Sequence, residues 1–204
     1  MGLFSLFKSS KPVYTDRVWR TTEYALQGMI TDAMVAITRK QVPVVICFFE
    51  DELQQITKFL AGKGVPAMAL RDYSMQPQEG VVLYASATNE FPLTLAKQTV
   101  AIFLFGHYPL PKKENEYLQK IKKVVPSAPL VFYSSLDEPA FKTFSGERLI
   151  GILDKLGMKE DEAIEHPIVT RSMQQARKKV ERMVRNEIPA TSEEGWFLKN
   201  INSK

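Results

Sequence analysis

Residues 44–64, VVICFFEDELQQITKFLAGKG, decide the fold of this 204-residue chain. The run VVICFF is continuously apolar and partly β-branched, which is typical of a strand buried on both faces of a sheet. Acidic residues open the next segment and glycines close it, as expected of a helix that begins directly after the strand. The stretch therefore predicts a strand followed by a helix, which is the repeating unit of an α/β protein.

The same alternation continues on both sides of this stretch. Residues 17–40 carry apolar side chains at three- and four-residue spacing and predict a long amphipathic helix with Asp16 as its N-cap. Another helix is predicted over Glu114–Val125. Further strands are predicted at Ala67–Leu70, Val81–Ala85, Val100–Phe105 and Leu130–Ser134. About five strands that alternate with helices predict a parallel sheet with helices on both faces.

The last third of the sequence is helical in pattern. A short helix is predicted over Glu147–Leu156, and a long one over Ile168–Asn186, after Pro167. We expect order to end near Pro189, although Trp196 and its neighbours are able to dock on the domain. The predicted organisation is a tail over 1–12, an α/β domain over 13–157, a helical extension over 158–190 and a second tail over 191–204.

Composition fits a globular protein, with 45% hydrophobic and 25% charged residues. The net charge of +4 is compatible with an anionic partner without requiring one. The single cysteine, Cys47, lies in the apolar run and is expected to be a buried thiol, which fits a reducing cytoplasm. One cysteine and two scattered histidines make a structural zinc site implausible. No apolar run reaches the ~18 residues of a transmembrane helix, so we expect a cytoplasmic protein.

The N-terminus, MGLFSLFKSSK, forms an apolar face if it is helical. The stretch lacks the features of a secretory signal and departs from the myristoylation pattern at Leu6. Two alternatives are open: a frayed tail, or weak contact with a membrane surface at the inner face of the plasma membrane. The candidate membrane-contact residues are Leu3, Phe4, Leu6 and Phe7.

The long predicted helix carries an apolar stripe beside many basic residues. The candidate interaction surface on it consists of Val169, Met173, Arg177, Val180 and Met183. Either the stripe folds back on the domain, or it offers a docking surface to another protein, a second copy of the chain included. We expect the basic residues to be solvated, and nucleic-acid binding is not favoured because no base-stacking motif accompanies them.

Motifs of catalysis are missing from the sequence. No GxxxxGK[ST] phosphate loop occurs, and the nearest string, GKG at 62–64, ends a predicted helix. His107 follows a predicted strand, where α/β proteins place ligands, but no GxSxG, HExxH or Cys–His pair accompanies it. We expect His107 to be satisfied within a loop. The chain is expected to have no catalytic residue, no cofactor and no metal site of its own.

Residues 132–181 contain short strings in a distinctive order and spacing. These strings are FYSSLDE, SGERL, LGM, EAIEHP and RKKVE. The segment resembles the end of the second motor domain of SecA, the bacterial preprotein translocase ATPase, together with the start of its long scaffold helix. The resemblance implies a RecA-like α/β domain, in agreement with the predicted strands.

The resemblance also implies a nucleotide site, for which the expected residues are missing. In SecA the second motor domain supplies arginines from a QLRGRAGR-like stretch, whereas the matching region 114–127 has none. A TNMAGRGTD-like loop is reduced to SATNEFP at 86–92. We therefore expect a non-catalytic SecA-related accessory or adaptor protein that acts through protein–protein contacts and is linked to preprotein translocation. Two alternatives stay open: a half-site that completes another chain's ATPase site, and a peripheral RNA or membrane-surface binder.

Overall fold

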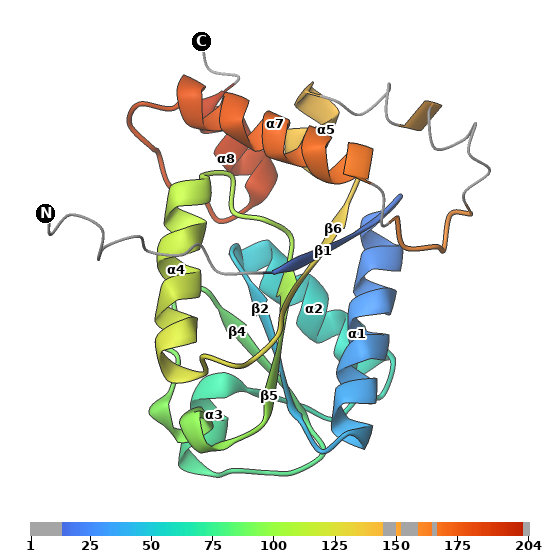
Figure 1. Cartoon of the computed structure of the whole chain (residues 1–204), viewed down its shortest axis with the longest axis vertical. Coiled ribbons are helices and arrows are strands. Elements are labelled where there is room, and N and C mark those ends of the chain that lie inside the picture. Colours follow the sequence, from blue (N-terminus) through green and yellow to red (C-terminus); the bar gives the residue numbers. More distant parts are fainter. Residues whose placement is uncertain (1–13, 145–149, 152–158, 165–166, 202–204) are drawn as a thin grey trace, which may run out of the picture.

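One sheet forms the centre of the computed structural model of this chain, which describes residues 14–144, 150–151, 159–164 and 167–201 (Figure 1). Its strands are β1 (Thr15–Trp19), β2 (Val42–Cys47), β3 (Ala67–Ala69), β4 (Val82–Ser86), β5 (Val100–Phe105) and β6 (Leu130–Ser135). Six strands lie in the order β1-β6-β5-β2-β4-β3, and every neighbouring pair is parallel. The sheet confirms the predicted fold class, a RecA-like α/β fold with flanking helices.

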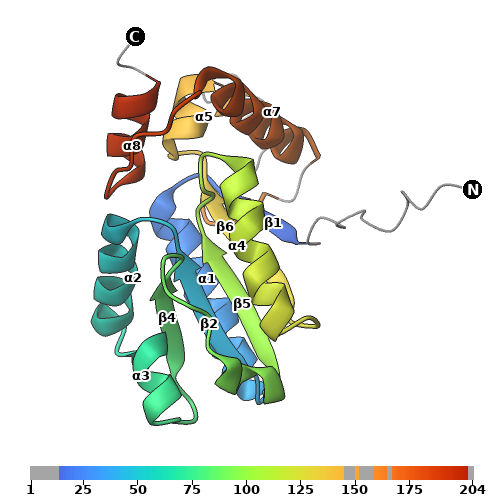
Figure 2. The same cartoon turned by 90° about the vertical axis from the view of Figure 1, so that its left-hand side faces the viewer.

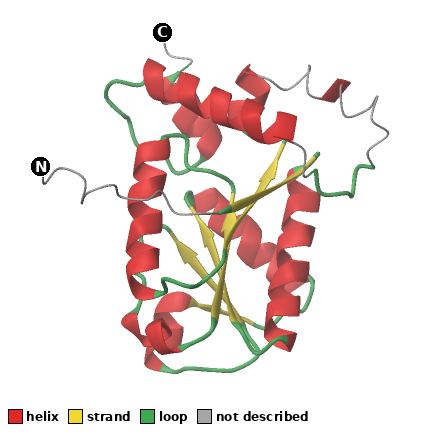
Figure 3. Ribbon diagram, in the orientation of Figure 1, coloured by secondary structure: helices red, strands yellow, loops and turns green. Residues whose placement is uncertain are grey.

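Helices cover both faces of the sheet. The helices α1 (Thr22–Thr38) and α2 (Glu50–Gly62) pack on one face. The short α3 (Leu70–Met75), the 3₁₀ helix η2 (Leu93–Lys97) and α4 (Pro111–Val124) pack on the other. Figure 2 shows α2 and α4 on opposite sides of the strands, and Figure 3 shows the same layers by colour.

Strand β2 is buried on both faces, as its apolar run predicts. Val44 and Ile46 belong to the core beneath α4, whereas Val45 and Cys47 belong to the core beneath α1 and α2. This alternation of strand residues between the two cores follows from the period of two along a strand. Cys47 is a buried free thiol, and burial raises its pKa above the ordinary value.

The predicted helix over 17–40 is wrong at its start, because residues 15–19 form strand β1. The strand pairs with β6 over its whole length, and Trp19 stacks on Tyr133 with ring centroids 5.5 Å apart. Helix α1 begins only at Thr22, where Thr21 is the N-cap and its hydroxyl accepts a hydrogen bond from the Tyr24 N–H. Pairing with a strand more than a hundred residues away overrides the local helical spacing, which sequence periodicity does not reveal.

The C-terminal helices lie together across one end of the molecule, beyond the carboxyl ends of the strands (Figure 1). They are α5 (Pro139–Phe144), α7 (Pro167–Met183) and α8 (Glu193–Asn200). The prediction that order ends near Pro189 is wrong, because α8 packs Trp196 and Phe197 against Phe49 and Val180. A helix this short is marginal alone in water, so its order comes from this packing. The predicted helix over Glu147–Leu156 falls almost entirely outside the described residues.

Candidate functional site

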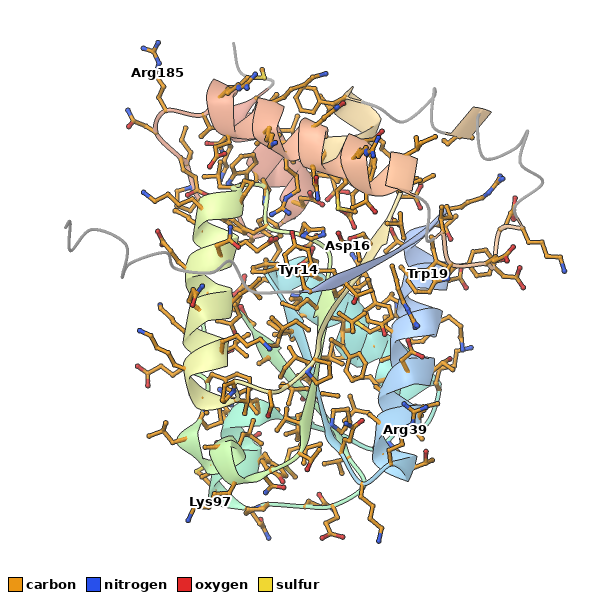
Figure 4. The ribbon with its side chains drawn as sticks, viewed as in Figure 1. Tyr14, Asp16, Trp19, Arg39, Lys97 and Arg185 are labelled. Carbon is orange, nitrogen blue, oxygen red and sulfur yellow. The ribbon has the colours of Figure 1, made fainter. Side chains whose placement is uncertain are left out.

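A buried network of charged side chains joins α7 to the sheet. Arg177 donates hydrogen bonds from Nη2 to the Glu114 carboxylate (2.7 Å) and to the Tyr108 carbonyl (3.2 Å). His107 contacts Glu114 through Nδ1 at 2.9 Å and Asp16 through Nε2 at 3.2 Å. Figure 4 shows Tyr14 and Asp16 close together beneath α7, where the chain enters β1. The network ties together β1, the end of β5, α4 and α7.

The positive and negative charges of this network balance one another, so we interpret the network as holding the fold together. Burial lowers the pKa of His107, but Glu114 and the hydrogen bond to Asp16 outweigh burial and raise it to about 9. Burial raises the pKa of Glu114, but His107 and Arg177 outweigh burial and bring it below the ordinary value. The imidazolium and the guanidinium therefore neutralise the two carboxylates at neutral pH. Both ring nitrogens of His107 have partners, so this geometry fits the expected satisfied histidine.

The apolar stripe of α7 faces the domain. Val169 and Met173 pack with Val18 and Phe141, and Val180 packs in the cluster around Trp196. The remaining stripe residue, Met183, is 39% exposed. Of the two arrangements that the sequence leaves open, this structure has the one in which the helix folds back. The candidate interaction surface of Val169, Met173, Arg177, Val180 and Met183 is thus mostly buried here.

The candidate membrane-contact residues are not placed by the structure. Leu3, Phe4, Leu6 and Phe7 lie outside the described residues. Among the residues that are described, no helix is long and apolar enough to cross a membrane.

The sheet has a topological switch point between β2 and β5. These neighbouring strands lead into helices on opposite faces, since α2 packs with α1 on one face and α4 lies on the other. In open α/β sheets, ligands bind in the crevice that this divergence leaves outside the carboxyl ends of the strands. The strand order therefore locates the candidate site independently of any motif.

A cavity of about 60 Å³ lies at this switch point, lined from α2, from the ends of β5 and β6, and from α8. We call it the acidic pocket. Six carboxyl side chains line it, and they belong to Asp51, Glu52, Asp137, Glu138, Glu193 and Glu194. No basic side chain is among its described lining residues. The walls thus carry one sign of charge.

The turn between β2 and α2 is already occupied by a carboxylate of the chain itself. Oε2 of Glu52 accepts hydrogen bonds from the backbone N–H groups of Phe48 (2.9 Å) and Phe49 (3.0 Å). Such N–H groups at a helix N-terminus are the ones that hold phosphate in nucleotide-binding α/β proteins. Gly106 faces this carboxylate with φ +66°, and a Cβ there would lie 3.0 Å from Oε1. The turn is therefore filled by a carboxyl group where a phosphate would need open donors.

Burial raises the pKa of the innermost acids. It raises the pKa of Glu52 to about 8, against the two backbone hydrogen bonds, which lower it. It raises the pKa of Glu138 to about 7, although His107 and the Ser135 N–H lower it. Burial, with the charges of Glu138 and Glu52, also holds the pKa of Glu193 well above its ordinary value. The pocket consequently retains protons near neutral pH.

The sequence did not indicate this pocket. Glu52 and Glu138 follow predicted strands, a position that gives a usable signal in α/β proteins. Glu193 lies in the segment predicted to be a disordered tail, so nothing local pointed to it. Within the described part of the chain, no group of three or more histidine, cysteine or acidic side chains has the arrangement of a metal site.

The fold and site define an α/β protein of RecA-like type with an acid-lined switch point. No protein-family model matches the chain. Curated proteins named protein translocase subunit SecA are similar to part of it. The one from Dechloromonas aromatica is 62% identical over 50 residues, that from Alkaliphilus oremlandii 54% and that from Acinetobacter baylyi 48% over the same length.

These matches cover a quarter of this chain and a small part of each relative. The aligned residues amount to 24% of the chain and 6% of each of those relatives. A segment of this protein is therefore SecA-related, which confirms the predicted resemblance to that family. The chain spans far less than the length of the curated relatives it matches.

Proposed function

We propose that this chain is a non-catalytic SecA-related accessory or adaptor protein that acts through protein–protein contacts. The acidic switch point carries this proposal. A nucleotide brings several negative charges, whereas the pocket already holds six carboxyl groups and Glu52 covers the N–H groups of the turn. With those N–H groups taken by Glu52, the turn has no open backbone donors for a phosphate, which disfavours phosphate binding there. The link to protein translocation rests on the name of the SecA relatives.

Basic residues do not compensate for the missing arginines of the motor. Arg177 lies near the site, and its Nη2 is engaged by Glu114 and by the Tyr108 carbonyl. Residues 114–127 match the SecA arginine stretch by position. Their lysines lie at the C-terminal end of α4, away from the carboxyl edge of the sheet. Among them, Lys122 donates to the carbonyls of Ala128 (2.6 Å) and Pro126 (3.2 Å). This placement disfavours the alternative of an ATPase half-site that completes another chain.

Two experiments on the full chain test the proposal. Release of phosphate from MgATP should stay at the level of the buffer with the chain alone, and adding the chain to purified SecA from the same host should not raise the rate above that of SecA alone. Affinity purification of the tagged chain from that host, with in-cell cross-linking, should recover a stoichiometric protein partner. ATP turnover that is proportional to chain concentration would overturn the non-catalytic proposal.

We place this protein in the cytoplasm, and weak membrane contact through the N-terminal residues stays a prediction.

A further inference from the structure

The acidic pocket has a chemical requirement that the chain itself does not meet. Its carboxyl groups come from three separate segments: α2, the turn between β6 and α5, and α8. Folding therefore brings acidic groups together from distant parts of the sequence. Concentrating acids in this way costs free energy, which a bound cation would offset.

Glu193 is the second observation that points to a ligand. Glu193 is only 8% exposed, and its side chain lines the acidic pocket from the first turn of α8. In the described structure its carboxylate accepts no hydrogen bond and joins no ion pair, unlike that of Glu52 or Glu138. Buried carboxyl groups in proteins normally have a partner. Glu193 is thus a buried acceptor that faces a cavity and has no protein partner among the described residues.

The size of the cavity selects the kind of cation. A single water needs roughly 10–15 Å³ measured in the same way, so about 60 Å³ admits an ammonium or a guanidinium group. A metal ion is disfavoured because the described acids do not have a metal-ligand arrangement. Anionic groups are disfavoured because no basic side chain is among the described lining residues.

We infer that the acidic pocket receives one lysine or arginine side chain from a partner protein, with Glu193 and Glu138 as its principal acceptors. That the side chain comes from a partner protein rests on the proposed adaptor function. That it is cationic rests on the acidic pocket alone. The guanidinium of arginine suits such a site well, because its five N–H donors are able to contact carboxylates on several walls at once. The side chain enters at the carboxyl edge of the sheet, between α2 and α8.

Protons compete with this cation. The acids that face Glu193 are Asp51 and Glu52 from α2, Asp137 and Glu138 from the turn before α5, and Glu194 from its own helix. On another side, His107 and Arg177 line a second, smaller cavity together with Glu138 and Glu193. Burial keeps protons on the inner acids near neutral pH, and a bound cation displaces them. Affinity for the cation should therefore rise as the pH increases from 6 to 8.

The test is a titration followed by backbone amide NMR on the full-length protein. Methylguanidinium and n-butylammonium chlorides are the probes, and tetramethylammonium chloride at equal ionic strength controls for salt, since it has no N–H donor. We expect saturable shifts of the Gly106, Glu138 and Glu193 amides with the two donor cations. The substitutions Glu193→Gln and Glu138→Gln should each weaken binding about tenfold, the scale of one charge-assisted hydrogen bond.

Glu116→Gln is the matched control, because Glu116 is exposed on α4 and remote from the pocket. Equal weakening by this control, or linear shifts that tetramethylammonium reproduces, would overturn the inference. Dispersed amide spectra of each variant establish that it is folded. If the donor cations do not bind and ATP is not hydrolysed, the pocket inference fails and the adaptor proposal stands. If ATP is turned over, the adaptor proposal fails whatever the cations do.

Discussion

His107 shows how one residue couples the fold to pH. Its pKa is about 9 in the folded chain, against about 6.5 for a free histidine. The carboxylates of Glu114 and Asp16 contact the two ring nitrogens and favour the protonated imidazole. Without the imidazolium, Glu114 would keep its contact with Arg177, whereas Asp16 would lose its contact with His107.

The pH dependence of this contribution has a definite sign. A pKa raised by folding stabilises the native state fully below about pH 6.5, and the contribution is lost as the pH rises through about 9. We expect His107→Gln to lower the free energy of unfolding by about 3 kcal/mol at pH 6 and by much less at pH 10. Urea unfolding at both pH values measures this difference. A pH-independent effect of the substitution would contradict the charged state assigned to His107.

Gly28 is a second residue whose role depends on packing. A Cβ at this position would lie 2.4 Å from Cζ2 of Trp19, which closes the edge of the sheet against Tyr133. We expect Gly28→Ala to destabilise the chain by about 1–3 kcal/mol through overpacking, despite the better helix propensity of alanine.

Gly62→Ala provides the control for this prediction, because nothing lies within 4 Å of its added Cβ in α2. It should leave the melting temperature unchanged or raise it slightly. If the two alanine variants melt alike, the tight contact between α1 and Trp19 is not formed in solution.

At the scale of elements, α8 depends on tertiary packing. Trp196 has no exposed surface, and its indole N–H donates to the Glu187 carboxylate at 2.7 Å. Glu187 also accepts hydrogen bonds from Tyr108 and Lys113, so the segment before α8 is tied to the start of α4. The helix thus closes the same end of the sheet that holds the acidic pocket.

The substitution Trp196→Ala tests this closure. We expect it to cost about 3–5 kcal/mol, since it removes a fully buried aromatic side chain. Leu198→Ala is the control on the same helix, because Leu198 is 60% exposed, and it should change stability by no more than about 0.5 kcal/mol. Thermal melting of the two variants separates the outcomes, and similar melting temperatures would mean that α8 does not dock.

The elements differ in how far the sequence predicted them. The central strands were found because β2, β5 and their neighbours are continuous apolar runs, as burial on both faces requires. Strand β1 was missed, because Val18 and Trp19 also fit the helical spacing of the segment that follows them. Helix α8 was missed because its order depends on Phe49 and Val180, which are distant in the sequence.

At the scale of the molecule, the candidate site could not be predicted from motifs. The missing phosphate loop and missing arginines indicated what the chain lacks, but the acidic pocket forms only when α2, the end of β6 and α8 meet. Its position follows from the strand order, which places the switch point between β2 and β5. Residues 132–181, whose sequence resembles SecA, contribute Asp137 and Glu138 to this pocket.

The central claim is that the nucleotide position of this fold is filled by the chain's own acids. Isothermal titration of the full-length protein with MgATP at neutral pH tests it most directly, with a P-loop ATPase measured in the same buffer as the positive control. We expect only the heat of dilution at sub-millimolar ATP, because the switch point offers carboxylates where phosphates need donors. Saturable heat with a micromolar Kd would contradict the account.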